Sequence, residues 1–586
     1  MEDYLGKGSE SSDTLCVLLH SFAGNPGRLD SVKRAVREVI PEADIWTPAL
    51  PAGLTSFADP EMLAVELMER LDVLWRNSDS YRRIILVGHS LGSLLARKIY
   101  VFACGETEAV PFDPRLKTDF PKLGQTRDWA GNVERIVLLA GMNRGWRVNH
   151  HLSMSRAATW RIGGWLLTGL SLLRRGTPLI FSIRKGAPFI TQLRIQWIAM
   201  RNTVESRGVG NAMTIQLLGS VDDIVAPEDN IDLVAGRNFV YLDVPYSGHG
   251  NVIELDDPTS LSLADGRVVV VGDARKEEFV AALTGKKQDL KHRSVIPSDL
   301  LTGNQDPDVD EVVFVIHGIR DVGYWTHKIA RRVVQQAQKK GLKIKIATET
   351  SSYGFLPMLP FLVPGRRREK VEWLMDQYSE SMALYPNAVF SFVGHSNGTY
   401  LLTKALEQYQ SCRFERAVFI GSVASRKYRW RERIQNGQIK RVLNIVASGD
   451  WVVAFFPKAL QSLGLQDLGS AGHDGFDETT DNPQALSEFR FVRGGHSAGL
   501  GEQNWGAIAG FILGDNEIDL PDSSTVDARS PWIALPAYVA PVIWILLGLI
   551  AALIGCLLWS LPPQEWQKTL LVAVYAFGLW KIVTSL

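Results

Sequence analysis

The sequence has few cysteines and no segment that resembles a secretion signal. Its 586 residues include four cysteines, which are widely separated and lie mostly in apolar segments: Cys16, Cys104, Cys412 and Cys556. This distribution predicts neither disulfide bonds nor a metal site, and we expect no other cofactor. Residues Met1 to Asp13 are polar, so we expect no signal peptide. Together these features predict that the folded part of the chain lies in a reducing cytosol.

The chain also lacks net charge, because 63 basic residues balance 63 acidic ones. Overall charge therefore excludes no class of partner, but the segment from Asn143 to Gly210 is locally basic and holds one acid, Glu205. Tryptophans are interleaved with its arginines and lysines: Trp146, Trp160, Trp165 and Trp197. This composition is typical of a segment that contacts anionic lipid, although a cap packed on its own domain is the alternative. The long apolar stretch from Trp165 to Leu173 argues against nucleic acid as the partner.

Charge is absent from Pro541 to Leu561, a stretch of 21 residues. Such a stretch is long enough to cross a hydrocarbon core of about 30 Å. A polar turn follows it, and we predict a transmembrane hairpin of two helices over about 533–561 and 569–586. The second helix is marginal as a span, and a re-entrant segment is the alternative. Small residues at Gly548, Ala551, Ala552 and Gly555 hint at close helix packing or a homo-oligomer.

The pentapeptide Gly-His-Ser-x-Gly occurs three times, at 88–92, 394–398 and 495–499. Each copy could place a nucleophilic serine on a sharp turn between a strand and a helix. Because the chain contains 51 glycines, one such match proves little. The surrounding sequence must supply a buried strand before the serine and a helix after it.

Two of the three serines have this context. Ser90 follows the apolar, β-branched run 81–87, and Ser396 follows the similar run 388–393. Helical sequences come directly after both serines. Ser497 is different, because 500–504 delays any helix and no histidine lies downstream of it. We therefore predict nucleophiles at Ser90 and Ser396, and a loop that presents His496 at the third copy.

A serine hydroxyl needs a histidine to remove its proton and an acid to orient the imidazole. Downstream of Ser90, an apolar run at 213–218 leads to Asp222, and the next run at 238–242 leads to His249. The neighbouring Asp223 is the alternative acid. Asp222 is preferred because it stands three residues before Val225, a spacing that recurs in the second half of the chain.

The same arrangement follows Ser396. An apolar run at 442–446 leads to Asp450, which stands three residues before Val453, and a run at 489–492 leads to His496. Two ordered sets of this kind, each behind a strand and a serine, favour two hydrolase-type sites over chance turns.

Acyl transfer also needs backbone N–H groups that face the developing oxyanion. One donor is expected from the residue after each serine, and the other from the loop after an early strand. The early strands 15–19 and 312–316 end in His20-Ser21-Phe22 and His317-Gly318-Ile319. The candidate donors are Phe22, Leu91, Ile319 and Asn397. The histidines of these loops are more typical of structural hydrogen bonding than of catalysis.

With these motifs, the chain resembles the α/β-hydrolase superfamily, specifically its lipase and esterase branch. The resemblance covers roughly residues 13–285 and 310–516. It implies two tandem α/β-hydrolase domains, each with a mostly parallel sheet flanked by helices. The first domain departs from the family by having Ser21 where glycine is usual, which affects its oxyanion loop.

We therefore predict a first domain at 1–285, a linker at 286–309, a second domain at 310–518, and a linker with the hairpin at 519–586. Ser90 and Asp222 are much farther apart than Ser396 and Asp450, so the first domain carries an insertion at about 143–210, where hydrolases commonly place a lid.

The predicted function is hydrolysis of lipid or acyl esters at a bilayer surface by a membrane-anchored, multi-pass protein with cytoplasmic hydrolase domains. Its partners are membrane lipids and the acyl-ester substrate. One alternative is that one domain, more readily the first, is a non-catalytic interaction or regulatory module. The others are a thioesterase, an acyltransferase, a peptidase, and an effector that damages membranes, since one triad supports several chemistries.

Overall fold

The computed structural model describes residues 4–9, 12–147, 176–220, 232, 238–263, 265–295, 305–319, 321, 323–354, 364–462, 467–478, 480, 482–516, 520–561 and 564–585. The chain divides into two compact units. The first comprises residues 1–305 and 375–384, and the second comprises 306–374 and 385–586. The first unit thus extends through most of the predicted linker, where α11 (Lys287–Arg293) forms.

The first unit is built on a seven-stranded sheet with the order β1-β3-β2-β4-β5-β6-β7. All neighbouring strands are parallel except the edge strand β1, which is antiparallel to β3. The strands are β1 (Tyr4–Gly6), β2 (Thr14–Leu19), β3 (Asp44–Thr47), β4 (Arg83–His89), β5 (Val133–Leu139), β6 (Met213–Gly219) and β7 (Phe239–Val244). Because parallel strands need crossover connections, helices cover both faces of this sheet.

Alternate residues of each strand enter different hydrophobic cores. In β2, Leu15 and Val17 pack with one layer of helices, while Cys16 and Leu18 pack with the other. The first layer includes α2 (Pro60–Arg76), α3 (Leu91–Cys104), α4 (Pro114–Asp119), α6 (Leu179–Ser182) and α7 (Pro188–Asn202). The second contains α1 (Asp30–Val39), α10 (Val271–Thr284) and α11. Burial on both faces explains why these strands are continuous apolar runs.

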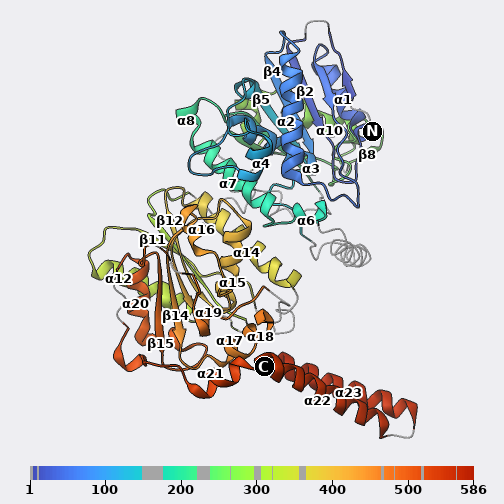
Figure 1. Ribbon diagram of the computed structural model, residues 1–586. Coiled ribbons are helices and arrows are strands. Elements are labelled where there is room, and N and C mark those ends of the chain that lie inside the picture. The colour runs from blue at the N-terminus through green and yellow to red at the C-terminus, as the bar shows by residue number, and fades with distance from the viewer. Residues whose placement is uncertain are drawn as a thin grey trace. The chain divides into compact units, whose positions relative to one another are not determined.

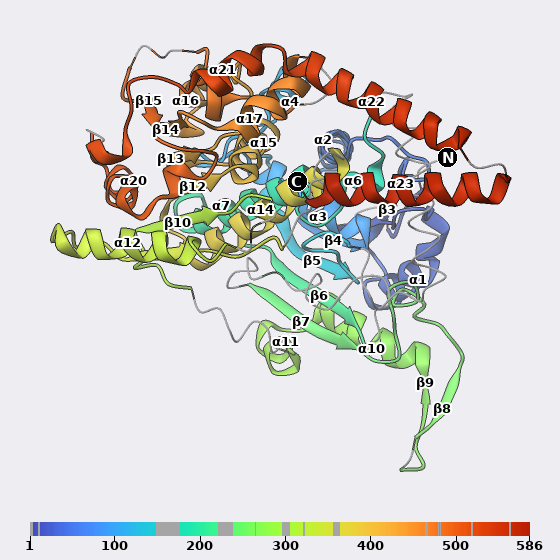
Figure 2. The same ribbon diagram turned by 90° about the horizontal axis from the view of Figure 1, so that it is seen from below.

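Two smaller elements complete the first unit. The short helix α8 (Val204–Arg207) follows α7, and an antiparallel hairpin forms from β8 (Ser260–Ser262) and β9 (Val268–Val270). In Figure 2 this hairpin extends away from the rest of the unit as a narrow arm. Val268 is 65% exposed there.

The second unit has a six-stranded sheet with the order β11-β10-β12-β13-β14-β15, and every pair is parallel. Its strands are β10 (Glu311–Ile316), β11 (Ile346–Glu349), β12 (Val389–His395), β13 (Phe414–Ile420), β14 (Ile439–Ala447) and β15 (Leu486–Val492). Helices α12 (Thr326–Lys339) and α20 (Trp505–Ile512) share a hydrophobic core with one face of this sheet. Helix α15 (Asn397–Gln408) packs against β12 from the other side (Figure 1).

The remaining helices of this part of the chain are α14 (Pro364–Leu384), α16 (Trp430–Gln435), α17 (Trp451–Phe455), α18 (Pro457–Ser462) and α19 (Ala471–Asp474). Residues 375–384 of α14 are grouped with the first unit. The mostly parallel sheets flanked by helices fit the α/β part of the predicted fold class.

Three helices end the chain: α21 (Pro531–Tyr538), α22 (Ala540–Ser560) and α23 (Glu565–Ser585). The single helix expected over 533–561 is thus interrupted at Val539. Pro541 causes this break, because it has no N–H to donate to the carbonyl of Ala537 and instead occupies the first turn of α22.

Helices α22 and α23 pack against each other, and the Tyr575 hydroxyl donates a 2.8 Å hydrogen bond to the Ala551 carbonyl. Among the helices of the described ranges, α22 has the length and apolar composition needed to cross a membrane. Helix α23 does not meet the same measure.

Candidate active site

Ser90 lies at the turn between β4 and α3. Its backbone is left-handed, with φ at 55° and ψ at −113°, and its N–H donates to the Leu139 carbonyl of β5 at 3.0 Å. This conformation raises the side chain out of the line of the strand. Gly92 is needed in the next turn, because a Cβ atom there would lie 2.1 Å from the Leu19 carbonyl oxygen.

His249 is the partner of Ser90. Its Nε2 lies 2.9 Å from Ser90 Oγ, although the two residues are 159 positions apart in the chain. Both side chains are largely buried. Asp222, the predicted acid of this set, and its alternative Asp223 lie outside the described residues.

Ser396 adopts the same turn in the second unit. Its φ is 52° and its ψ is −116°, and its N–H donates to the Ile420 carbonyl of β13 at 2.9 Å. The loop after β10 approaches closely, because a Cβ atom on Gly318 would lie 2.8 Å from Ser396 Cβ. Glycine at 318 therefore allows the predicted oxyanion loop to reach the serine.

His496 and Asp450 come together beside this turn. His496 Nδ1 lies 2.9 Å from Asp450 Oδ2, and the Asp450 side chain is fully buried. The other carboxylate oxygen, Oδ1, accepts the Val453 N–H at 3.0 Å, so Asp450 also caps the N-terminus of α17. In the part of the chain that the structure describes, no hydrogen bond joins His496 to Ser396, and catalytic hydrogen bonds often tighten only when substrate binds.

Two histidines that the sequence did not suggest as functional lie directly before the serines. His89 Nε2 is 2.8 Å from the His249 carbonyl oxygen, and His395 Nε2 is 3.4 Å from the His496 carbonyl oxygen. Each therefore holds the backbone of the histidine predicted as the base of its unit. The repeated histidine in Gly-His-Ser-x-Gly was the available signal.

His395 is electrically neutral in this position. Burial, together with the nearby His496, lowers the pKa of His395 from 6.5 to about 3. A neutral ring can donate from Nε2 to the His496 carbonyl without bringing a second positive charge to the site.

The candidate oxyanion donors stand at the start of helices and in the loops after early strands. Leu91 opens α3 and Asn397 opens α15, so their N–H groups belong to the unpaired first turn of a helix. Phe22 and Ile319 lie in the loops after β2 and β10. Sequence reasoning missed Tyr353, whose hydroxyl donates to the His317 carbonyl at 3.1 Å and accepts from Asn397 Nδ2 at 3.1 Å.

The histidines of these loops have structural hydrogen bonds. In the first unit, His20 Nε2 accepts the Leu50 N–H at 3.1 Å, and His20 Nδ1 lies 2.9 Å from the Ser21 carbonyl oxygen. In the second, His317 Nε2 is 2.7 Å from Ser352 Oγ. Burial lowers the pKa of both histidines, which keeps them neutral.

The described part of the predicted lid packs on its own unit. Residues 148–175, which include Trp160 and Trp165, lie outside the described residues, but α7 contacts α3 and Trp197 is fully buried. Arg194 of α7 and Arg97 of α3 both approach the buried Asp232, at 3.1 and 3.6 Å. This ion cluster ties the lid helix to the helix that follows Ser90.

The third pentapeptide forms an exposed turn. Ser497 is exposed and precedes a short 3₁₀ segment, and α20 begins only at Trp505. Within the described ranges, no group of three or more His, Cys, Asp or Glu side chains is arranged to hold a metal ion. Burial also raises the pKa of the Cys16 and Cys104 thiols to about 12, so neither is a thiolate nucleophile at neutral pH.

Residues 9–113 match the model of a family described as "Putative serine esterase (DUF676)". The matched segment contains Ser90 with β4 and α3, and it spans less than half of the chain. A comparison with curated proteins finds no sequence match.

Several solved structures align with part of the chain. Est1E from Butyrivibrio proteoclasticus, in a complex with ferulic acid, is 13% identical, with 48% of this chain and 95% of that one covered and a TM-score of 0.27. A structure of the metagenome-derived lipolytic enzymes LipS and LipT is 14% identical. The alignment covers 43% of this chain and 90% of that one, with a TM-score of 0.26. The NocB thioesterase domain is 12% identical, and the alignment covers 48% of this chain and 100% of that one, with a TM-score of 0.26. These likenesses are too weak to assign a function to this chain.

Proposed function

We propose that the protein is a membrane-anchored serine hydrolase with two α/β-hydrolase domains, which cleaves lipid or acyl ester bonds at the bilayer surface. The observation that carries the proposal is the 2.9 Å approach of Ser90 Oγ to His249 Nε2 at a left-handed turn between a strand and a helix. The matching turn at Ser396 and the His496–Asp450 pair support a second site. The serine esterase family that matches the segment around Ser90 supports ester hydrolysis.

In this mechanism each serine attacks the ester carbonyl while its histidine, His249 or His496, takes the hydroxyl proton. The resulting tetrahedral oxyanion accepts hydrogen bonds from backbone N–H groups in the first turn after the serine and in the early loop. The histidine then gives its proton to the leaving alcohol. Water repeats these steps on the acyl-enzyme and releases the acid. Asp450 accepts a hydrogen bond from His496 Nδ1 and stabilises the imidazolium that forms.

Lipid as the substrate is supported by the apolar helix α22. Its length and composition suit a membrane span, and large apolar side chains are exposed along it, including Leu549 at 61% and Leu553 at 60%. An enzyme held by such a helix meets bilayer lipids at a high local concentration. A thioesterase, an acyltransferase or a peptidase would use the same triad with a different substrate or acceptor.

The experiment is active-site labelling of the full-length protein with a fluorophosphonate probe, followed by mass spectrometry. We expect label on Ser90 and Ser396 in the wild type, on one of them in Ser90→Ala and Ser396→Ala, and on neither in the double variant. Removing a nucleophile should lower kcat at its site by roughly 10⁴-fold or more. Ser497→Ala is the matched control, because Ser497 shares the pentapeptide but lies in an exposed turn.

If neither serine is labelled, the proposed enzyme activity is wrong. Label on Ser396 alone would favour the second candidate, in which the first domain is a non-catalytic module. Ser21 favours that candidate, because it stands in the oxyanion loop at the position where the second unit has Gly318. Hydrolysis of soluble short-chain esters without any hydrolysis of vesicle phospholipid would exclude lipid as the substrate.

A further inference from the structure

Helix α21 exposes one strongly apolar side. Trp532, Leu535 and Tyr538 are 87%, 70% and 76% exposed, and they are spaced three residues apart, whereas Ala537 between them is buried. Residues so spaced share one side of a helix. The span α22 begins two residues after α21 ends, and no charged residue occurs from Pro531 to Leu561. Tryptophan and tyrosine beside a span are typical of the headgroup level of a bilayer.

This helix is attached to the loop that carries the Asp450 carboxylate. The Ser530 N–H, at the start of α21, donates to the Ser448 carbonyl at 2.9 Å, two residues before Asp450. Helix α17, which Asp450 caps, packs against both α21 and α22. In Figure 1 the helical hairpin leaves the second unit where α17, α18 and α21 gather.

Side chains of α17 and α22 strengthen the attachment. Trp544 of α22 donates from Nε1 to the Phe455 carbonyl at 2.9 Å and makes an edge-on ring contact with Phe456 at 5.6 Å. Trp451, the residue after Asp450 and the first of α17, is 52% exposed, so it adds a large exposed apolar side chain on the helix that packs against α21. We call Trp451, Trp532, Leu535 and Tyr538 the interfacial face.

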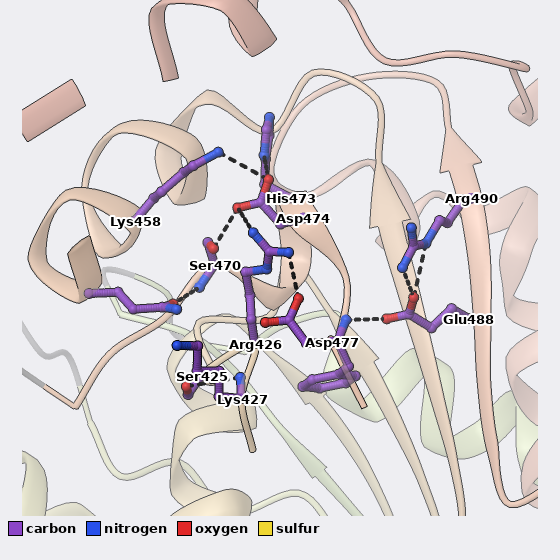
Figure 3. Close-up of polar contacts among 12 residues, drawn as sticks. Ser425, Arg426, Lys427, Lys458, Ser470, His473, Asp474, Asp477, Glu488 and Arg490 are labelled. Carbon is purple, nitrogen blue, oxygen red and sulfur yellow. Dashed lines mark hydrogen bonds and ion pairs between the residues drawn. The ribbon is translucent and has the colours of Figure 1, made fainter. Parts of the chain in front are cut away.

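The buried carboxylate of Asp474 joins several segments of the second unit (Figure 3). Asp474 accepts hydrogen bonds from Ser470 Oγ at 2.6 Å and from Lys458 Nζ at 3.1 Å, and it lies 3.0 Å from His473 Nδ1. Arg529, just before α21, donates to the Asp474 backbone carbonyl at 3.1 Å. Lys458 also lies over the Tyr538 ring, 5.1 Å from its centre. The network therefore joins α18, α19 and the start of α21.

The charge state of Asp474 suits this role. Although burial raises its pKa, hydrogen bonds from His473 and Ser470 and the charge of Lys458 more than offset that effect and hold the pKa well below its usual range. Asp474 thus remains ionised at neutral pH, and the network persists under ordinary conditions.

We infer that the interfacial face lies in the headgroup region of the bilayer that holds α22, so that the Ser396 site takes its ester bonds directly from lipids in that bilayer. The inference rests on the proposed function and adds the surface through which substrate arrives. Extraction of a lipid from the bilayer would expose the apolar surface of its acyl chain to water. An acyl chain that enters along the interfacial face avoids this exposure.

The direct test places an environment-sensitive NBD label at position 532 of the full-length protein. The carrier variant is Trp532→Cys with Cys556→Ser, because Cys16, Cys104 and Cys412 are buried and should resist labelling. The protein is reconstituted into phosphatidylcholine vesicles that contain doxyl-labelled lipid. We expect quenching of the label at 532, and none of comparable size from the control site Val389→Cys in the same unit, which is 45% exposed at the start of β12, at the sheet edge opposite the Asp450 loop.

The second test compares hydrolysis of vesicle phospholipid with hydrolysis of a soluble short-chain ester, both in a Ser90→Ala background. In the variant Trp532→Ala/Leu535→Ala we expect the ratio of the two rates to fall about tenfold, because less apolar surface enters the interface. The control variant Leu342→Ala/Ile344→Ala instead removes exposed apolar side chains just before β11, at the sheet edge of the same unit opposite the Asp450 loop, and it should keep the wild-type ratio.

Equal quenching at positions 532 and 389, or an unchanged ratio of rates in the variant Trp532→Ala/Leu535→Ala, would overturn the inference. Blue-shifted NBD emission at position 532 without quenching by the doxyl-labelled lipid would also overturn the inference. In that case a protein surface, and not lipid, would cover the interfacial face. Failure of the proposed function has a different signature. In that case either alkaline carbonate extracts the protein from vesicles, or Ser396 hydrolyses neither substrate.

Discussion

Ser90 and Ser396 share a backbone conformation that L-amino acids rarely adopt. Their φ angles of 55° and 52° lie in the left-handed half of conformational space, while their ψ angles keep them out of the ordinary left-handed helical region. Such residues cost about 1–3 kcal/mol each and persist only where the surrounding structure imposes them. Here the N–H of Ser90 donates to the Leu139 carbonyl of β5, and the N–H of Ser396 donates to the Ile420 carbonyl of β13. These hydrogen bonds help to hold both serines in this conformation.

Gly92 is one residue on which this turn depends. In Gly92→Ala the new Cβ would lie 2.1 Å from the Leu19 carbonyl oxygen, so α3 would have to move away from β2. We expect a loss of about 1–3 kcal/mol in the free energy of unfolding and weaker fluorophosphonate labelling of Ser90. Label on Ser396 should be unaffected. Gly131→Ala is the control, because a Cβ at 131 would have no neighbour within 4 Å among the described residues; equal effects of the two variants would contradict the steric argument.

His395 predicts a dependence of stability on pH. Its pKa is about 3 in the folded protein, against 6.5 for an ordinary histidine, so the unfolded chain binds more protons between these values. The contribution of the neutral His395 ring to the free energy of unfolding is therefore fully present above pH 6.5, and it is lost as the pH falls toward 3. In His395→Gln, which keeps a donor but does not titrate, the denaturation midpoint should fall less steeply over this range. Identical slopes for the two proteins would rule out this assignment.

At the scale of elements, the attachment of α7 to α3 depends on buried charge. Asp232 is fully buried and faces Arg194 and Arg97, so in Asp232→Asn the buried Arg97 loses this counter-charge, while Arg194 keeps Asp376 at 2.8 Å. Removing one partner of a buried ion pair typically costs about 3–5 kcal/mol. We expect a clearly lower melting temperature for this variant.

The control for that variant is Asp265→Asn, which removes an exposed ion pair with Arg267. Exposed pairs contribute little, so the melting temperature should be unchanged. A loss of stability that is equal in the two variants would show that burial of Asp232 is not the cause.

The sequence predicted the elements that carry strong local signals. Buried parallel strands are continuous apolar runs, and the turns at Ser90 and Ser396 follow from glycine spacing between a strand and a helix. The break at Val539 was missed because hydropathy reports only how apolar a segment is, whereas Pro541 acts through a missing hydrogen bond. The roles of His89 and His395 were missed for a related reason: their partners are backbone carbonyls more than 100 residues away, and side-chain patterns do not reveal these.

At the scale of the whole molecule, the proposed membrane attachment predicts different contributions from α22 and α23. Among the helices of the described chain, α22 alone meets the length and composition of a span. A chain that ends at Leu561 keeps α22 and should stay in the membrane pellet after alkaline carbonate. A chain that ends at Val539 should be released. If both truncated chains are released, the anchor requires α23 as well, and the attachment is a true two-helix hairpin.

Asp450 has two roles in the structure, and this has an evolutionary consequence. The same carboxylate orients His496 and caps the helix that supports the interfacial face, so a substitution there harms both chemistry and local folding. Among its described contacts, the Ser396 side chain has no second structural role of this kind. A lineage that abandons catalysis in this domain while keeping the fold should therefore lose the serine first and retain the aspartate. In descendants of this protein, an aspartate at 450 would be a poor marker of activity, and the serine at 396 a good one.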